Sequence, residues 1–250
     1  MQEASTIDEV IDQLTEIINW ANAQSSTLGY FPALYRRVTI LVKQKIAENH
    51  FDDGPRMEKL DVIFANRYIQ AFHHYQNNDE LTESWRIAFE ASKSFWPIVL
   101  QHLLLGMNAH INLDLGIASA TVCPGNQIDS LKGDFDKINA LLASLVNQVE
   151  DQLARVWPVL KLLDWVGGRK DEKVINFSIN IARMQAWQVA KSFAKTPQEE
   201  WPTEITALDG QIAKIADKVY NPGAFLSTVA GIIRIGERGS VQKKITILGE

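Results

Sequence analysis

Apolar residues recur at helical spacing along nearly the whole chain. Near the start, Thr6 and Glu9 form a capping box, and the apolar positions that follow are Ile7, Val10, Ile11, Leu14, Ile17, Ile18 and Ala21. Spacings of three and four residues place such side chains on one face of a helix. No segment carries a convincing series of strands. The pattern therefore predicts an all-α protein.

Prolines, glycines and short polar runs divide this pattern into about nine helices. Pro32 and Pro55 each stand where a helix begins, because proline is tolerated in a first turn. A long amphipathic helix is expected over 134–156. We expect a single-domain helix bundle over residues 1–250. The final stretch, 239–250, alternates weakly and is expected to form a short strand or a loose tail.

The segment 96–121 is an almost continuous apolar run into which His102, His110 and Asp114 are set. His110 and Asp114 are four residues apart, so a helix places them on one face. The same face carries Val99, Leu103, Met107 and Ile117, while a polar stripe of Gln101, Asn108, Asn112 and Ser119 lies behind it. Burying titratable groups is costly without a partner. The pattern indicates either a functional site in the core or a buried structural ion pair.

The helix that starts at Pro55 also carries an inward carboxylate. Asp61 lies in the middle of an apolar and aromatic stripe, Glu58 lies on the flank of that stripe, and His73 lies at its edge. Asp61, His73, His110 and Asp114 form a set of nitrogen and oxygen ligands suited to zinc, iron or manganese, and bundles assemble such sites from facing helices. His102 is then expected at the rim of the site.

A structural interpretation of the same residues stays open. A core histidine often only donates to a backbone carbonyl, and Asp61 could pair with Arg67, Arg36 or Arg37. His110, Asp114 and Asp61 would then form a buried polar network that makes the core specific.

Composition narrows the function further. The chain has 250 residues and a formal net charge of −5 with scattered basic residues, which argues against nucleic-acid binding. The polar residues of 96–121 would be expensive in lipid, so no membrane span is expected. The acidic N-terminus lacks a secretory pattern, and one cysteine, Cys123, fits a reducing compartment, so we expect a cytoplasmic protein.

Two sequence blocks carry a family resemblance. FDDGPRMEKLDVIFANRY and WPIVLQHLLLGMNAHINLDLGIA resemble the signature blocks of an uncharacterised bacterial family, known as a domain of unknown function, over most of 7–160. The resemblance implies an all-helical soluble protein and no established activity. LGMNAHINLD is also similar to the helix of zinc-dependent phospholipase C and P1-type nucleases that supplies a histidine and an aspartate to zinc. That similarity carries over to His110 and Asp114 alone, because this chain has no histidine after His110.

Two hypotheses follow. The first is a metal-dependent enzyme with Asp61, His73, His110 and Asp114 around one divalent metal. It would be a hydrolase acting on a hydrophobic or phosphoester substrate, or an oxygenase. Glu58 or Asp134 would serve as its catalytic base, and Asp134 could instead be a further metal ligand. The second is a non-catalytic helical domain that binds a small hydrophobic molecule or a partner.

Overall fold

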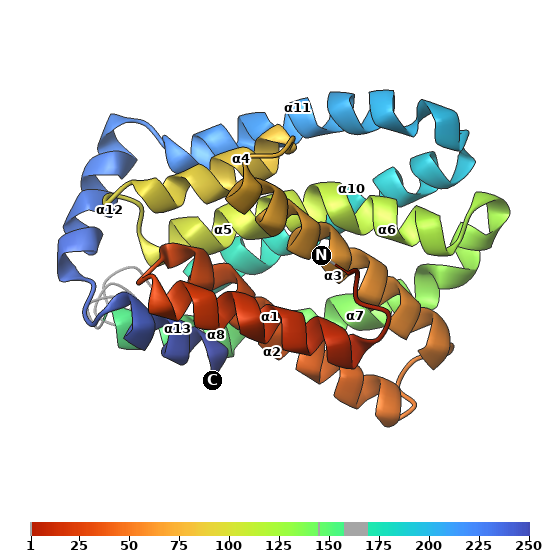
Figure 1. Cartoon of the computed structure of the whole chain (residues 1–250), viewed down its shortest axis with the longest axis horizontal. Helices are drawn as coiled ribbons and strands as arrows, with labels where there is room; N and C mark the ends of the chain where they lie inside the picture. Colours follow the sequence, from red (N-terminus) through yellow and green to blue (C-terminus); the bar gives the residue numbers. More distant parts are fainter. Residues whose placement is uncertain (1, 145, 158–169) are drawn as a thin grey trace.

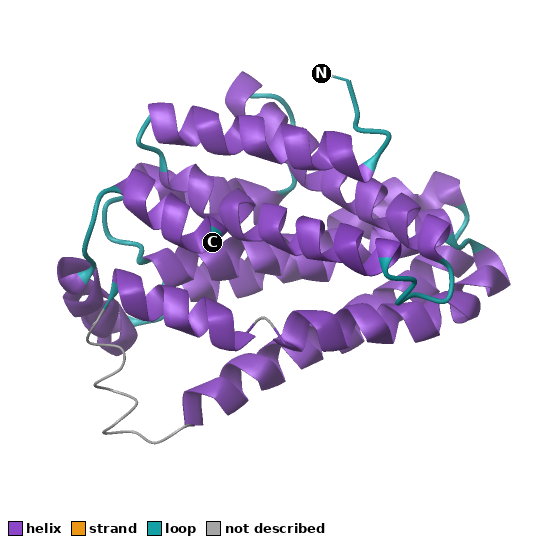
Figure 2. Cartoon of the chain, turned by 90° about the horizontal axis from the view of Figure 1, so that it is seen from below, coloured by secondary structure: helices purple, strands orange, loops and turns teal. Residues whose placement is uncertain are grey.

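The computed structural model describes residues 2–144, 146–157 and 170–250, and these residues form helices and no strands (Figure 2). The all-α prediction is therefore confirmed, with one helical body. The α-helices are α1 (Ile7–Ala23), α2 (Tyr30–Ala47), α3 (Gly54–Asn77), α4 (Glu83–Glu90), α5 (Val99–Ala109), α6 (Leu115–Val122), α7 (Lys132–Ser144), α8 (Val146–Val156), α10 (Lys170–Lys195), α11 (Trp201–Tyr220), α12 (Ala224–Gly236) and α13 (Val241–Gly249). Short 3₁₀ turns lie at Thr27–Gly29, Ala91–Lys93, Gly125–Leu131 and Gln198–Glu200.

Local sequence signals start several of these helices. The Thr6 side chain accepts a hydrogen bond from the backbone N–H of Glu9, and α1 begins at Ile7. The Asp53 side chain caps α3 in the same way, with Pro55 in the first turn. The helices expected over 96–121 and 134–156 each correspond to more than one helical segment among the described residues. The first consists of α5, a π-helical turn (His110–Asp114) and α6. The second falls within α7 and α8, and residue 145 between them lies outside the described residues.

Most helices run along the long axis of the molecule, while α12 crosses one end (Figure 1). The pair α1 and α2 packs on α3, and α11 packs on α4 and α5. The central path α5–π turn–α6 lies between these layers, with α10 against α6. This arrangement encloses the central path on several sides, which explains its high content of apolar residues.

The polar stripe of the central helix faces α11. The Gln101 side chain donates to the carbonyl of Val219 at 2.8 Å, and the Asn108 side chain donates to the carbonyl of Ile212 at 3.1 Å. Asn112 donates to the Asn108 side chain at 2.9 Å. Gln101 and Asn108 therefore bind backbone carbonyls of α11 and hold the two helices in register, and Asn112 supports the Asn108 side chain.

The C-terminal prediction was wrong, because the last residues form α13. Ser240 caps this helix by accepting from the N–H of Lys243, and Ile245, Ile247 and Leu248 are buried. Val241, Ile245 and Leu248 are spaced by four and three residues, so a helix brings them to one face. α13 packs on α2 and α8. Packing on these helices outweighs the weak alternation of 239–250.

Membrane crossing is not supported by the described helices, none of which combines the length and the apolar character that a span requires.

Candidate functional site

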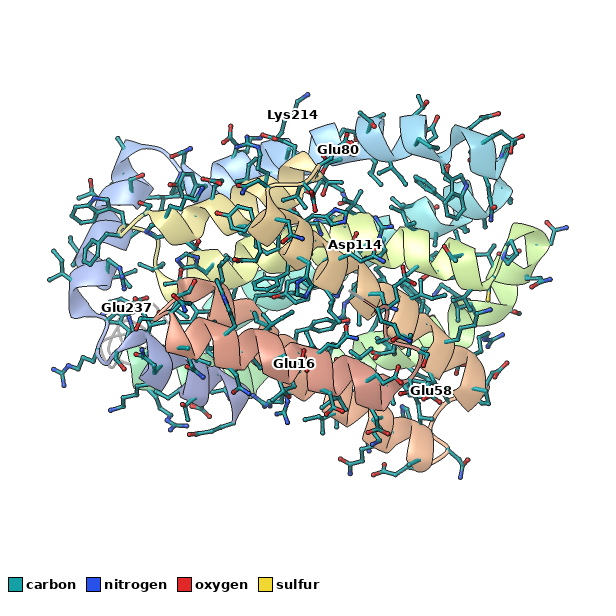
Figure 3. All side chains as sticks on the ribbon, viewed as in Figure 1. Glu16, Glu58, Glu80, Asp114, Lys214 and Glu237 are labelled. Carbon is teal, nitrogen blue, oxygen red and sulfur yellow. The ribbon has the colours of Figure 1, made fainter. Side chains whose placement is uncertain are left out.

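The His110–Asp114 pair lies in the π-helical turn between α5 and α6, and both residues are buried. Figure 3 labels Asp114 near the middle of the view. The His110 Nδ1 atom is 3.3 Å from Asp114 Oδ2, and both side chains are almost wholly buried. Burial lowers the pKa of His110, and the hydrogen bond that His110 makes to Asp114 only partly opposes this effect. His110 is therefore neutral near pH 7.

Asp114 has two further donors, which come from neighbouring helices. Arg67 Nε on α3 donates to Asp114 Oδ1 at 2.7 Å, and Trp85 Nε1 on α4 donates to Asp114 Oδ2 at 3.0 Å. Burial alone would raise the pKa of Asp114, but the Arg67 guanidinium and the bond to His110 lower it on balance. The carboxylate is thus ionised, and three donors from α3, α4 and the π turn converge on it.

Aromatic rings fix the position of the imidazole. Phe64 stacks on His110 with ring centroids 3.6 Å apart and planes 8° apart, and the edge of Tyr35 approaches at 4.6 Å. The rings of Phe31, Trp85 and Tyr68 lie within 6.2 Å of the same imidazole. This aromatic enclosure leaves the ring little freedom to turn.

An apolar cavity of about 170 Å³ lies beside the imidazole, with His110 in its wall. The α2 wall contributes Phe31, Leu34, Tyr35, Val38 and Val42, and the α3 wall contributes Leu60, Asp61 and Phe64. The central path adds Leu100, Leu103, Leu104, Met107, Ile111 and Leu115, while α7, α8 and α10 add Ile138, Asn139, Leu142, Val149, Leu153 and Arg183. Most of these side chains are aliphatic or aromatic, which is typical of a small-molecule site.

The cavity wall also contains one acidic side chain, Asp61, and one basic side chain, Arg183. Burial raises the pKa of Asp61 to about 7, with a smaller contribution from Glu58. Its Oδ2 atom has no hydrogen-bond partner among the described residues. Burial also lowers the pKa of Arg183 to about 10, and this side chain donates to the carbonyl of Asn139 at 3.0 Å. The pairing of Asp61 with Arg67 that the sequence allowed is not formed, since Arg67 binds Asp114.

Two of the predicted histidines lie elsewhere. His73 lines a separate, more polar cavity of about 560 Å³, together with Glu3, Gln13, Asn66 and other residues of α1, α3 and the N-terminal segment. Burial lowers the pKa of His102 to about 3, and the nearby cations Arg234 and Lys244 add to this effect. The ring of His102 packs edge-on against Tyr30 at 5.6 Å. Neither histidine is among the residues that line the apolar cavity.

Asp134 and Glu58, the two predicted catalytic bases, do not line the cavity and instead accept hydrogen bonds elsewhere. Asp134 accepts from the backbone N–H groups of Asp52 and Asp53 at 2.7 and 3.1 Å and from Arg56 at 3.1 Å. These bonds explain its burial, because they hold the loop in front of α3. Glu58 accepts from the N–H of Ile7 at 3.5 Å, at the start of α1.

The four predicted metal ligands are not brought together as one group, although His110 and Asp114 are in contact. The described parts of the chain contain no group of three or more His, Cys, Asp or Glu side chains placed to hold a metal ion. Asp114, which the resemblance to zinc enzymes would make a ligand, accepts instead from Arg67, Trp85 and His110. The arrangement of these residues therefore does not fit the predicted metal site. The metal-dependent reaction stays a prediction.

Sequence reasoning missed Trp85, Phe64 and Arg183 as parts of the site. Trp85 and Phe64 fit the helical pattern of ordinary core residues, so nothing in their spacing linked them to His110. Arg183 lies on α10, more than seventy residues from His110 along the chain. Arg67 had been named, but as a partner for Asp61.

The fold and the site define an all-α protein whose core combines a buried polar network with an apolar cavity. The chain belongs to a family of unknown function, DUF5995, whose model matches residues 7–222. The family resemblance seen in the two sequence blocks is thereby confirmed. No curated protein and no solved structure shows significant similarity to the chain.

Proposed function

We propose that this protein binds a small apolar molecule in the cavity between α2, α3, α5 and α7. The observation that carries the proposal is the cavity itself, about 170 Å³ in volume and walled almost entirely by aliphatic and aromatic side chains. An apolar cavity of about 150 Å³ lined by similar residues stays dry and binds benzene. The size therefore favours a single ring or a short alkyl chain over a long lipid.

The buried network supports binding because it makes the wall rigid. Arg67, Trp85 and Asp114 tie α3, α4 and the π turn together, and Phe64 and Tyr35 hold the imidazole in the wall. A preformed pocket loses little conformational entropy when a ligand enters. This corresponds to the non-catalytic alternative that the sequence left open.

Toluene provides a direct test on the full-length protein. A ligand that binds the folded state alone raises stability, by about 1.4 kcal/mol at ten times its dissociation constant. We expect saturating toluene to raise the midpoint of thermal unfolding. We also expect the ¹²⁹Xe resonance of dissolved xenon to report an apolar site that toluene displaces.

A matched pair of variants assigns the site to this cavity. Val42 on α2 lines the cavity and Val62 on α3 does not, although both are buried. Val42→Phe places a ring in the cavity and should abolish the effect of toluene, whereas Val62→Phe should retain it in whatever fraction folds. No response to toluene or xenon in the wild-type protein would contradict the proposal, as would an equal response in both variants.

A further inference from the structure

The protonation of His110 is fixed by its neighbour. Asp114 is ionised, and a carboxylate accepts hydrogen bonds without donating any. The His110 Nδ1 atom, 3.3 Å from Asp114 Oδ2, must therefore be the donor. A neutral imidazole has one donor nitrogen and one acceptor nitrogen. The other ring nitrogen, Nε2, consequently carries a free lone pair.

No residue that the structure describes uses this lone pair. The His110 Nε2 atom is buried and has no hydrogen-bond partner among the described residues. The residue is 3% exposed and lines the apolar cavity, so the atom is also shielded from bulk solvent. Stacking by Phe64 and the bond to Asp114 hold the ring in this orientation. An unpaired buried acceptor is costly and calls for an explanation.

We infer that the ligand is a small apolar molecule with one hydroxyl group, an alcohol or a phenol, which donates its hydrogen to His110 Nε2. The inference rests on the proposed function and adds the polar group that the pocket recognises. A hydroxyl supplies the missing donor, while the rest of the molecule occupies the apolar space. Sites that hydrogen-bond a ligand hydroxyl discriminate strongly against analogues that lack it, because the protein atom is then left unpaired.

Phenol and toluene test this choice, because they are similar in size and differ in the hydroxyl group. The quantity to compare is the ratio of their affinities, measured by calorimetry on the wild-type protein and on variants. His110→Phe keeps an aromatic ring but removes Nε2, and we expect the ratio to shift against phenol by about tenfold. His102→Phe replaces another buried histidine outside the cavity wall and should leave the ratio unchanged.

Nitrogen NMR on the wild-type protein makes the test independent of whether His110→Phe folds. With ¹⁵N-labelled histidine, phenol should shift the His110 Nε2 resonance, Nδ1 should stay protonated, and toluene should leave the Nε2 resonance almost unchanged. If toluene binds but phenol neither moves Nε2 nor gains affinity from His110, the inference is wrong and the proposed function stands. If neither compound binds, both are wrong.

Discussion

Asp61 and Asp114 are both buried aspartates, yet their carboxyl groups have opposite surroundings. Three N–H donors, one of them on an arginine, converge on Asp114 and keep it ionised. Asp61 faces the apolar cavity, and no described group donates to or pairs with its Oδ2 atom. Partners, rather than burial alone, decide which acid stays charged.

Asp61 should make the stability of the protein fall as the pH rises from about 4 to about 7. Burial raises its pKa from an ordinary value of 3.8 to about 7, so in this range the folded protein holds a proton that the unfolded chain has released. Asp61→Asn removes the titration. We expect the variant to gain about 2–3 kcal/mol over the wild-type protein between pH 5 and pH 8 in urea unfolding.

The free energy of unfolding of Asp61→Asn is compared with that of the wild-type protein at each pH. The difference cancels the contributions of the other titrating groups, including His110. Asp12→Asn, on the exposed side of α1, is a suitable control and should follow the wild-type pH dependence. A constant difference between Asp61→Asn and the wild-type protein across this range would show that Asp61 titrates normally in the folded state.

At the scale of the helices, close approach between α6 and α10 depends on Gly116. A Cβ atom added there would lie 2.5 Å from Val189 Cγ1 and 3.1 Å from the carbonyl oxygen of Ala186. Gly210 on α11 provides the contrast, because an added Cβ would meet nothing within 4 Å.

Gly116→Ala should destabilise the protein and Gly210→Ala should stabilise it. The first forces the two helices apart, at a cost of about 1–3 kcal/mol. The second removes backbone entropy from the unfolded chain and improves helix propensity, for a gain of about 0.5–1 kcal/mol. Urea unfolding of both variants measures the difference. Equal stability of the two variants would mean that α6 and α10 are not packed as described.

Helices with clear caps and apolar spacing could be predicted from the sequence, whereas α13, the π turn and the assembly of the helices could not. The capping residues Thr6 and Asp53 and the apolar spacing of α1 act within a few residues, so they are visible in the chain. The π turn at 110–114 has no such local signal, and it changes the register between α5 and α6. His110 and Asp114 were paired correctly because they are one turn apart. Their contacts with Arg67, Trp85 and Phe64 depend on how α3 and α4 pack, which periodicity does not specify.

At the scale of the whole molecule, the family match ends at residue 222 but the packed core does not. α13 lies beyond the match, and its Ile245 side chain fills the space beside Gly29, where an added Cβ would be 2.5 Å from Ile245 Cδ1. Glu237, between α12 and α13, lies at one end of the molecule (Figure 3) and connects this C-terminal part to the start of α5. Its carboxylate accepts from the N–H of Val99 at 2.7 Å, from Arg234 at 2.8 Å and from Lys244 at 2.9 Å.

Glu237→Gln should loosen the end of the molecule where α5, α12 and α13 meet. The neutral amide leaves the buried Lys244 ammonium without its counter-charge and weakens the anionic cap on the first turn of α5. We expect a loss of about 3–5 kcal/mol in urea unfolding, as for other broken buried pairs. Hydrogen exchange should rise first in α13 and at the start of α5, with α1 and α3 protected until global unfolding.

Glu16→Gln, at an exposed position of α1, should change stability by less than about 0.5 kcal/mol. A loss from Glu237→Gln as small as that of Glu16→Gln would mean that the C-terminal helices are held by apolar packing alone.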